Sequence, residues 1–248
     1  KFMDIKCRMS GLRPDAVVIV ATVKALKYNG GVAKDNLKEE NVEALSRGIS
    51  NLEKHIENMQ NFGTPVVVAL NRFATDTDKE LETVVKCCEK YGVKCSMCEV
   101  FAKGGEGGTE LAQYVIDVID NNPAQYKPVY DVNDSIENKV ESIVKNIYGG
   151  NGVIFSNKAK KAIKQLAELG LDKKPVCIAK TQYSLSDNPS LLGRPQGFDV
   201  EIKTVRISNG AGFIVAEAGD IMTMPGLPKV PAAENIDIDD NGIISGLF

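Results

Sequence analysis

The chain has 248 residues, of which 43% are hydrophobic and 25% are charged. This length and composition are typical of a folded protein with one large domain or two small ones, and they exclude a wholly disordered or fibrous chain. Its 30 Lys and Arg residues are balanced by 33 Asp and Glu residues, and the resulting net charge of −3 argues against a nucleic-acid partner.

Residues 15–121 alternate short β-branched runs with longer helical patterns, which is typical of βαβ units around a mainly parallel sheet. Residues 15–22 form a continuous apolar run, as in a strand covered on both faces. Polar residues 22–31 are predicted to form a loop. In the helix that follows, apolar residues recur in steps of three and four up to a terminating Gly63. These residues are Val42, Leu45, Ile49, Leu52, Ile56 and Met59.

Residues 65–70 are predicted to form a second buried strand. A helix begins shortly afterwards, near Thr77, because Thr77 and Glu80 have the spacing of a capping box. Residues 93–101 have the pattern of a third strand, and the glycine-rich segment 102–108 leads from it into another helix.

The periodicity breaks at residues 121–128, which contain two prolines and two asparagines, so we place a domain boundary after residue 125. Residues 1–125 are assigned to the α/β domain and residues 126–248 to a smaller α+β domain. In the second domain we expect helices at 136–147 and 157–169, strands at 175–179 and within 198–215, and an ordered proline-rich tail over 222–231.

The apolar runs and the cysteines indicate in which compartment of the cell the protein is expected. The longest apolar runs are far shorter than the roughly 20 residues that a membrane-spanning helix needs, so no membrane partner is expected. Few cysteines and no apolar signal segment favour free thiols and a cytoplasmic location. The cysteines are Cys7, Cys87, Cys88, Cys95, Cys98 and Cys177. Because the chain opens on Lys1 and Phe2 inside a patterned region, we expect a fragment of a longer protein.

Ligands of an open parallel sheet bind outside the carboxyl ends of the strands, where loops diverge and helix N-termini point N–H groups into the crevice. Three predicted polar loops meet this condition, at residues 22–31, 71–76 and 103–108. The last contains four glycines together with Lys103 and Glu106. It suits either an anion site or a flexible strand-to-helix connection.

Three side chains stand at predicted strand ends. The Asn71 amide, with both a donor and an acceptor, can bind the edge of a purine or pterin, or it can simply turn the chain. Phe73 and Phe101 lie at the same predicted edge of the sheet, where exposed rings can stack on a planar heterocycle. Burial in a core is the alternative for each ring.

Several catalytic motifs are missing from the sequence. No G-x-x-x-x-G-K-[ST] segment is present, so these residues carry no P-loop for nucleotide phosphates. His55 is the single histidine, and its helical position argues against a Ser/His/Asp triad and a multi-histidine metal site. Cys95 and Cys98 have C-x-x-C spacing, but Cys87 and Cys88 lack the spacer of a zinc framework, so we expect no metal site.

Five segments resemble formate–tetrahydrofolate ligase, also called 10-formyltetrahydrofolate synthetase, and they occur in the order of that family. They are VATVKALKYNGG (20–31), NRFATD (71–76), AKGGEGG (102–108), AKTQYSLSD (179–187) and GDIMTMPGLPK (219–229). The resemblance runs from the first residue to the last, and so many long ordered segments are highly specific.

The resemblance implies the family's fold and reaction. We expect part of a P-loop NTPase-like, nucleotide-binding sheet of mainly parallel strands. The family uses Mg-ATP and a monovalent cation to activate formate as formyl phosphate, transfers the formyl group to N10 of tetrahydrofolate, and forms homotetramers. Its members are much longer, so this chain resembles their carboxy-terminal part. The P-loop and the catalytic residues are then expected in a missing amino-terminal part, without which the chain is inactive.

By the same resemblance, Phe73 and Phe101 match the two aromatic positions that sandwich the pterin ring. The second position is usually tryptophan in the family, so Phe101 offers a smaller platform. Lys24 replaces an arginine, which keeps the charge but loses bidentate geometry. Further cleft-lining positions follow from the same segments: Asn71, Asp76, Lys103, Gly104, Gly105, Glu106 and Gly107.

Two other hypotheses stay open. The chain can be one subunit of a naturally split ligase, whose partner carries the P-loop. It can also be a non-catalytic module for folate binding or oligomerisation. An amino-terminal partner would restore activity in the first case and not in the second.

Overall fold

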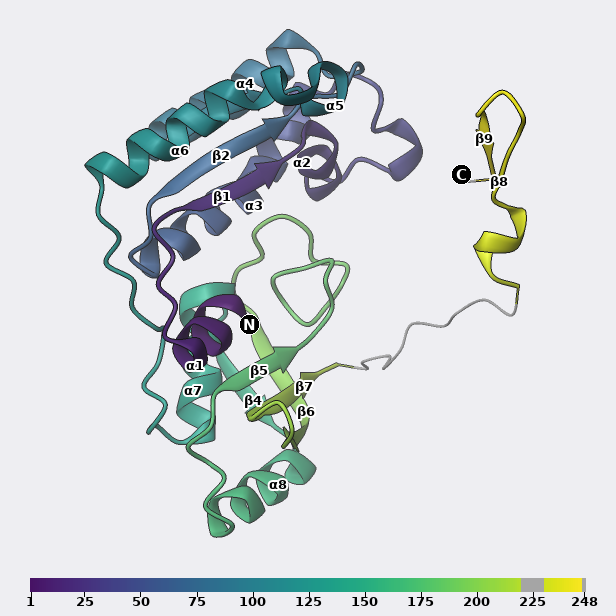
Figure 1. Ribbon diagram of the computed structural model, residues 1–248. Coiled ribbons are helices and arrows are strands. Elements are labelled where there is room, and N and C mark those ends of the chain that lie inside the picture. The colour runs from purple at the N-terminus through teal and green to yellow at the C-terminus, as the bar shows by residue number, and fades with distance from the viewer. Residues whose placement is uncertain (220–229, 247–248) are drawn as a thin grey trace.

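A computed structural model describes residues 1–219 and 230–246, and Figure 1 shows its two sheets one above the other. The first sheet contains β1 (Val17–Ala21), β2 (Val66–Asn71) and β3 (Lys94–Cys98) in that spatial order. All its neighbouring strands are parallel, with Val18 opposite Val67 and Ala69 opposite Ser96. The expected α/β class with a mainly parallel sheet is therefore confirmed.

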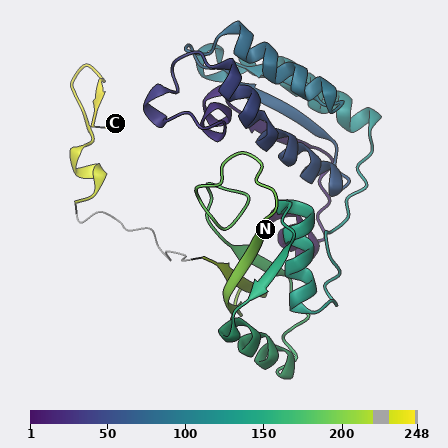
Figure 2. The ribbon, with the colours of Figure 1, turned by 180° about the vertical axis from the view of Figure 1, so that it is seen from behind.

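Helices cover the two faces of this sheet unequally. One face packs on α2 (Val23–Asn29), α3 (Val42–Asn61) and α4 (Asp78–Lys90), around a core that includes Leu45, Ile56 and Leu70. Figure 2 views the molecule from the side on which α3 lies. The opposite face carries α6 (Thr109–Asn121), which packs on β2 and β3.

The expectation that the first strand is covered on both faces is wrong. Val18 and Val20 lie on the α6 side, since they pair with Val67 and Ala69 in the register, and they are 40% and 68% exposed. The reason is that α6 lies over the other two strands. In the residues that the structure describes, β1 is an edge strand with one uncovered face.

Two further local predictions need correction. Residues 22–31 were expected to form a loop, but most of them form α2, because Thr22 caps the helix and Val23, Leu26 and Lys27 are buried on one face. The third strand was expected to reach residue 101, but it ends at Cys98. The chain then forms the single-turn helix α5 (Val100–Lys103) and the 3₁₀ helix η3 (Gly104–Gly108).

The second sheet is mixed and has the order β4-β6-β7-β5. Its strands are β4 (Gly152–Phe155), β5 (Val176–Ala179), β6 (Asp199–Ser208) and β7 (Phe213–Ala218), of which only β6 and β7 are antiparallel neighbours. The helical elements are α7 (Ile136–Ile143), its continuation η4 (Val144–Tyr148) and α8 (Asn157–Glu168). The expected helices and three of the strands are confirmed, whereas the sequence analysis missed β4.

Residues near the amino terminus pack against the second half of the chain. The segment η1 (Phe2–Cys7) continues into α1 (Arg8–Ser10), and Arg8 donates a 2.7 Å hydrogen bond to the carbonyl of Tyr130. Tyr126 Oη donates to the carbonyl of Met3 at 2.7 Å. A boundary after residue 125 stays a prediction. These two hydrogen bonds join residues from before it to residues from after it.

Elements near the carboxyl terminus are short. Residues 220–229, which include most of the expected proline-rich tail, lie outside the described residues. Beyond them, η5 (Ala232–Asn235) precedes a small antiparallel pair, β8 (Asp237–Ile238) and β9 (Ile244–Ser245). A last short helix, η2 (Lys34–Asn36), lies between α2 and α3. None of the described helices is long and apolar enough to cross a membrane.

Candidate functional site

A cavity of about 680 Å³ opens at the carboxyl ends of β2 and β3. This is the edge at which open parallel sheets bind ligands. Both singled-out aromatic residues line it, Phe73 from the segment after β2 and Phe101 from α5 after β3. Among the residues that the structure describes, those that line it are Asn71, Arg72, Phe73, Ala74, Glu99, Phe101 and Ala102.

A tight turn holds Phe73 at this edge. The Phe73 N–H donates to Asp76 Oδ2 at 2.9 Å, and the Asp76 N–H donates back to the Phe73 carbonyl at 3.0 Å. The Asp76 side chain is buried, so its carboxylate serves the turn and does not line the cavity. Phe73 itself is 38% exposed, which leaves ring surface available for a ligand.

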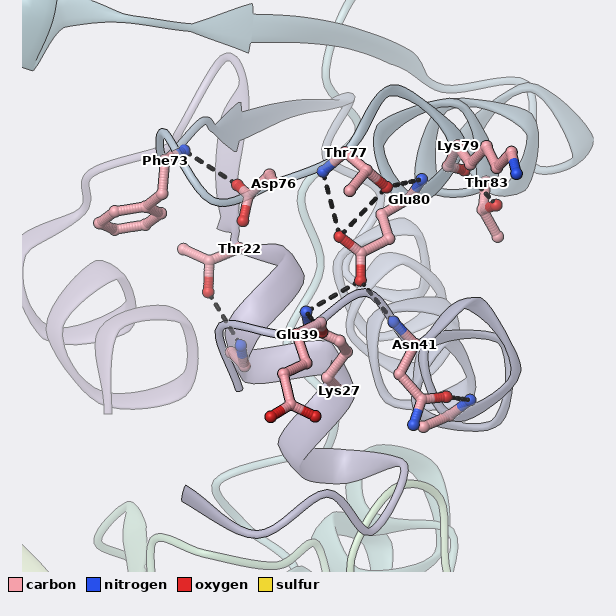
Figure 3. A network of polar contacts seen from close by, with 12 residues as sticks. Thr22, Lys27, Glu39, Asn41, Phe73, Asp76, Thr77, Lys79, Glu80 and Thr83 are labelled. Carbon is pink, nitrogen blue, oxygen red and sulfur yellow. Dashed lines mark hydrogen bonds and ion pairs between the residues drawn. The ribbon is translucent and has the colours of Figure 1, made fainter. Parts of the chain in front are cut away.

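The helix that follows this turn starts with the predicted capping box. Thr77 accepts from the Glu80 N–H, and the Glu80 carboxylate accepts from the Thr77 N–H at 3.1 Å. Glu80 is fully buried and also accepts from Lys27 Nζ at 2.8 Å, as Figure 3 shows. This ion pair joins α4 to α2, and through Thr77 it lies next to the Phe73 turn.

Burial alone would raise the pKa of the Glu80 carboxyl group. Hydrogen bonds from the Lys27 ammonium and from two backbone N–H groups outweigh burial and hold this pKa below its usual 4.5. Lys27 also donates to the carbonyl of Glu39 at 2.7 Å. The Glu80 carboxylate is therefore ionised and well hydrogen-bonded at neutral pH.

Lys24 lies one turn before Lys27 on α2. Its Nζ is 4.4 Å from the centroid of the Phe73 ring, a cation–π contact. Lys24 does not line the cavity. The sequence analysis noted this residue only as a departure from the family pattern. Its contact with Phe73 depends on the spacing between two elements that lie far apart in the sequence.

Phe101 lies on the one-turn helix α5, and its side chain is fully exposed. The connection after it folds back tightly, since the Glu99 N–H donates to the Gly107 carbonyl at 3.0 Å. A Cβ at Gly107 would stand 2.5 Å from the Glu99 carbonyl, so this close approach requires glycine. The fold-back places Phe101 on an exposed corner beside the cavity.

Charges around the cavity are largely paired. Arg72 lies 3.6 Å from an Asp78 oxygen and 3.7 Å from a Glu99 oxygen, and Lys103 Nζ lies 2.5 Å from Glu99. The hydrogen bond from Lys103 holds the pKa of Glu99 below its usual value. Arg72 and Glu99 were not predicted as site residues. Arg72 lies within the segment 71–76 that resembles the family, whereas Glu99 lies outside the five segments.

The structure separates the other expected cleft residues into two groups. Asn71 lines the cavity at the end of β2. Lys103 points to Glu99, and the glycine segment forms the η3 turn behind α5, so neither lines this cavity. Their role in ligand binding stays a prediction. The residues concerned are Lys103, Gly104, Gly105, Glu106 and Gly107.

The residues of η3 do not fit the phosphates of ATP. The carboxylates of Glu99 and Glu106 add negative charge where phosphate would need positive charge, and the one cation of the segment, Lys103, is already paired with Glu99. The segment is therefore poorly suited to hold nucleotide phosphates. Within residues 1–219 and 230–246, no group of three or more His, Cys, Asp or Glu side chains is placed to hold a metal ion.

Two other cavities lie between the two sheets. One, of about 640 Å³, is lined mostly by apolar side chains such as Phe62, Ile143 and Val176, and it offers few polar groups to orient a ligand. The other, of about 260 Å³, includes His55 and Lys180. Lys180 Nζ donates to the carbonyls of Thr181 and Ser184, which explains it as a structural residue.

The structure is that of an α/β protein with an aromatic-lined cavity at the carboxyl edge of a parallel sheet, where proteins of this class bind ligands. A family model for formate–tetrahydrofolate ligase matches residues 1–248. The chain belongs to this family. The substrates of this family are tetrahydrofolate, formate and ATP.

Proposed function

We propose that these residues form the folate-binding wall of a formate–tetrahydrofolate ligase, with the pterin ring stacked between Phe73 and Phe101. The observation that carries the proposal is that both rings line one cavity of about 680 Å³ at the ligand edge of the sheet. Their exposure supports it, because a ring kept for a core would be buried.

The proposed site has chemistry suited to a flat, polar heterocycle. Two aromatic faces restrict the ligand to one plane and so orient the acceptor nitrogen toward an incoming formyl group. The Asn71 amide, at the end of β2, offers a donor and an acceptor to the pterin edge. Glu99 adds a carboxylate that can accept from pterin N–H groups.

Calorimetric titration of the chain with tetrahydrofolate tests the stacking proposal. We expect Phe73→Ala and Phe101→Ala each to weaken binding by about 1 kcal/mol, the scale of one aromatic contact. Phe2→Ala is the matched control, since Phe2 is also half exposed but lies outside the cavity. Unchanged affinity in both cavity variants, or no measurable binding by the parent chain, would contradict the proposal.

We further propose that nucleotide phosphates and formate are bound by residues beyond these 248, because the sequence has no P-loop motif and η3 does not fit phosphate. The chain alone should then show no ATP- and formate-dependent formylation of tetrahydrofolate. Turnover should appear when an amino-terminal part bearing a P-loop is added. Turnover by the chain alone would refute this division, and folate binding without restored turnover would favour a non-catalytic module.

Other properties are carried over from the family as proposals. They are Mg²⁺ as the ATP counter-ion, a monovalent-cation requirement, a homotetramer for the complete enzyme, and a cytoplasmic location. The last is supported by the six cysteines, all of which are free thiols. Sedimentation velocity of the complete enzyme tests the tetramer, and titration of activity with potassium and magnesium salts tests the cations.

A further inference from the structure

Lys24 and the cavity meet Phe73 from different sides. Lys24 Nζ lies 4.4 Å from the ring centroid, yet Lys24 is not among the residues that line the cavity, whereas Phe73 is. Lys24 follows β1 and Phe101 follows β3, so the sheet order β1-β2-β3 places them on opposite sides of the end of β2, from which Phe73 extends. The Phe73 ring is therefore placed between a cation and the space in which a heterocycle would stack. Phe101, on the other side of that space, has no cation–π partner within the described residues.

The cation is held in this position by its helix. Thr22 Oγ1 caps the first turn of α2 by accepting from the Ala25 N–H at 3.1 Å. One turn later, the buried pair of Lys27 with Glu80 fixes α2 to the start of α4. Glu80 is also bonded to Thr77, next to the turn that holds Phe73, so one carboxylate connects α2 to the residue that follows this turn (Figure 3).

No described carboxylate competes with the Phe73 ring for the Lys24 ammonium group. Arg72 and Lys103, the two other cations beside the cavity, are paired with carboxylates. Lys24 has no carboxylate partner among residues 1–219 and 230–246. It is also half-buried, which reduces the screening of its field by water.

A cation on one face of an aromatic ring draws π density toward itself, so the opposite face becomes less negative. A face of this kind repels an electron-rich heterocycle less and attracts an electron-poor one less. Reduced pterins are electron-rich, because reduction leaves one aromatic pyrimidine ring that carries amino-nitrogen donors. Fully oxidised pterins are electron-poor, since both fused rings are aromatic and nitrogen-rich.

We propose that Lys24 is a specificity-determining residue, which acts through the Phe73 ring to favour reduced over oxidised pterins. The inference rests on the proposed stacking of the pterin on Phe73. Lys24 is a positioning and polarising residue, since it lies behind the ring. The discrimination should be a property of the charge at position 24, not of the side-chain length.

The test compares the dissociation constants for tetrahydrofolate and for fully oxidised folate, measured anaerobically by calorimetry on the full chain. We expect Lys24→Met to lower the ratio of the dissociation constant for folate to that for tetrahydrofolate on the order of threefold. An effect of this size corresponds to a fraction of the energy of one cation–π contact. Lys24→Gln is a second neutral variant, and Lys24→Arg should retain the ratio of the parent chain. Lys79→Met is the control for lost charge, because Lys79 is exposed on α4 and contacts no ring.

The outcomes distinguish a failure of the proposed role of Lys24 from a failure of the proposed stacking on Phe73. If Lys24 is only structural, both constants change by the same factor in Lys24→Met and the ratio stays constant, which would overturn the inference. A ratio that rises, or one that Lys24→Arg fails to preserve, would also overturn it. A Phe73→Ala variant that binds both ligands as the parent does would overturn the proposed stacking site itself.

Discussion

Arg194 and Glu57 form a bidentate ion pair, with Nη1 to Oε1 at 2.8 Å and Nη2 to Oε2 at 2.7 Å. The pair connects the segment between β5 and β6 to α3 of the first sheet. In the same contact, Asn51 Nδ2 donates to the Gly193 carbonyl at 2.8 Å, and the Gly193 N–H donates to Asn29 Oδ1 at 3.1 Å. Figure 1 shows this long connection reaching from the second sheet toward α2 and α3.

Replacing Glu57 by Gln should destabilise the fold by about 1 kcal/mol at pH 7, since the pair is bidentate but partly exposed. Burial would raise the pKa of Glu57, but the hydrogen bonds and charge of Arg194 outweigh it and lower this pKa below its usual 4.5. A carboxyl group whose pKa is lowered by folding stabilises the fold at pH values above its pKa in the unfolded state. This contribution is lost as the pH falls through its pKa in the folded state. Urea unfolding at pH 7 and pH 3 should therefore show the variant and the parent converging at the lower pH. A gap of the same size at both pH values would rule out this linkage.

The Lys27 and Glu80 pair should behave non-additively. Lys27→Met alone leaves a buried carboxylate without its cation and should cost about 3 to 5 kcal/mol of unfolding free energy. The double variant Lys27→Met/Glu80→Gln removes both charges, and the Gln amide can still accept from the Thr77 N–H. We expect it to cost clearly less than the sum of the single changes, as measured by urea unfolding. Glu82→Gln in the exposed pair with Lys86 is the control and should change little. Additive losses would argue against a coupled pair.

Gly48 should not tolerate alanine, although alanine ordinarily stabilises a helix interior by about 1 kcal/mol over glycine. A Cβ at Gly48 would lie 1.8 Å from the Leu26 carbonyl oxygen, so α2 would have to move away from α3. We expect Gly48→Ala to destabilise the fold by about 3 kcal/mol, measured by thermal or urea unfolding. Gly210→Ala is the control, because a Cβ there meets no atom within 4 Å. A stability equal to that of the parent would show that the two helices are not in such close contact.

We expect the chain to self-associate through the uncovered side of β1, where Val18 and Val20 are exposed. Edge strands with exposed apolar residues pair readily with other chains, and charged residues prevent such pairing. The double variant Val18→Thr/Val20→Lys should lower concentration-dependent association in sedimentation velocity while leaving the unfolding midpoint nearly unchanged. The exposed Ile154 on β4 gives a matched control, Ile154→Lys, at an edge of the other sheet. Association that persists in the double variant would place the contact elsewhere.

Local sequence signals predicted much of the fold, because the responsible interactions are short in sequence. The capping box at Thr77 and Glu80 and the end of α3 near Gly63 depend on residues within one helical turn. The prediction of a loop over 22–31 was wrong because of one local misreading. Lys27 was counted as polar, although it is buried and completes the inward face of α2.

Other features could not be predicted from local patterns. A run such as Val17–Ala21 is the same in a covered strand and in an edge strand, and only the placement of α6 distinguishes them. At the site, the sequence predicted Phe73 and Phe101. It could not predict that Lys24 lies behind Phe73, because this depends on how α2 packs beside the end of β2.

The connection at residues 122–128 has a consequence for dividing the chain. The Gln125 N–H donates to the Gly63 carbonyl at 2.7 Å, and the Lys127 N–H donates to the Phe62 carbonyl at 2.9 Å. Phe62 shares a small apolar cluster with Met3 and Tyr126, from both sides of residue 125. Either half expressed by itself would expose that cluster to water and lose these backbone partners. The backbone between Gln125 and Lys127 should also resist protease cleavage, since these two hydrogen bonds hold it against the end of α3.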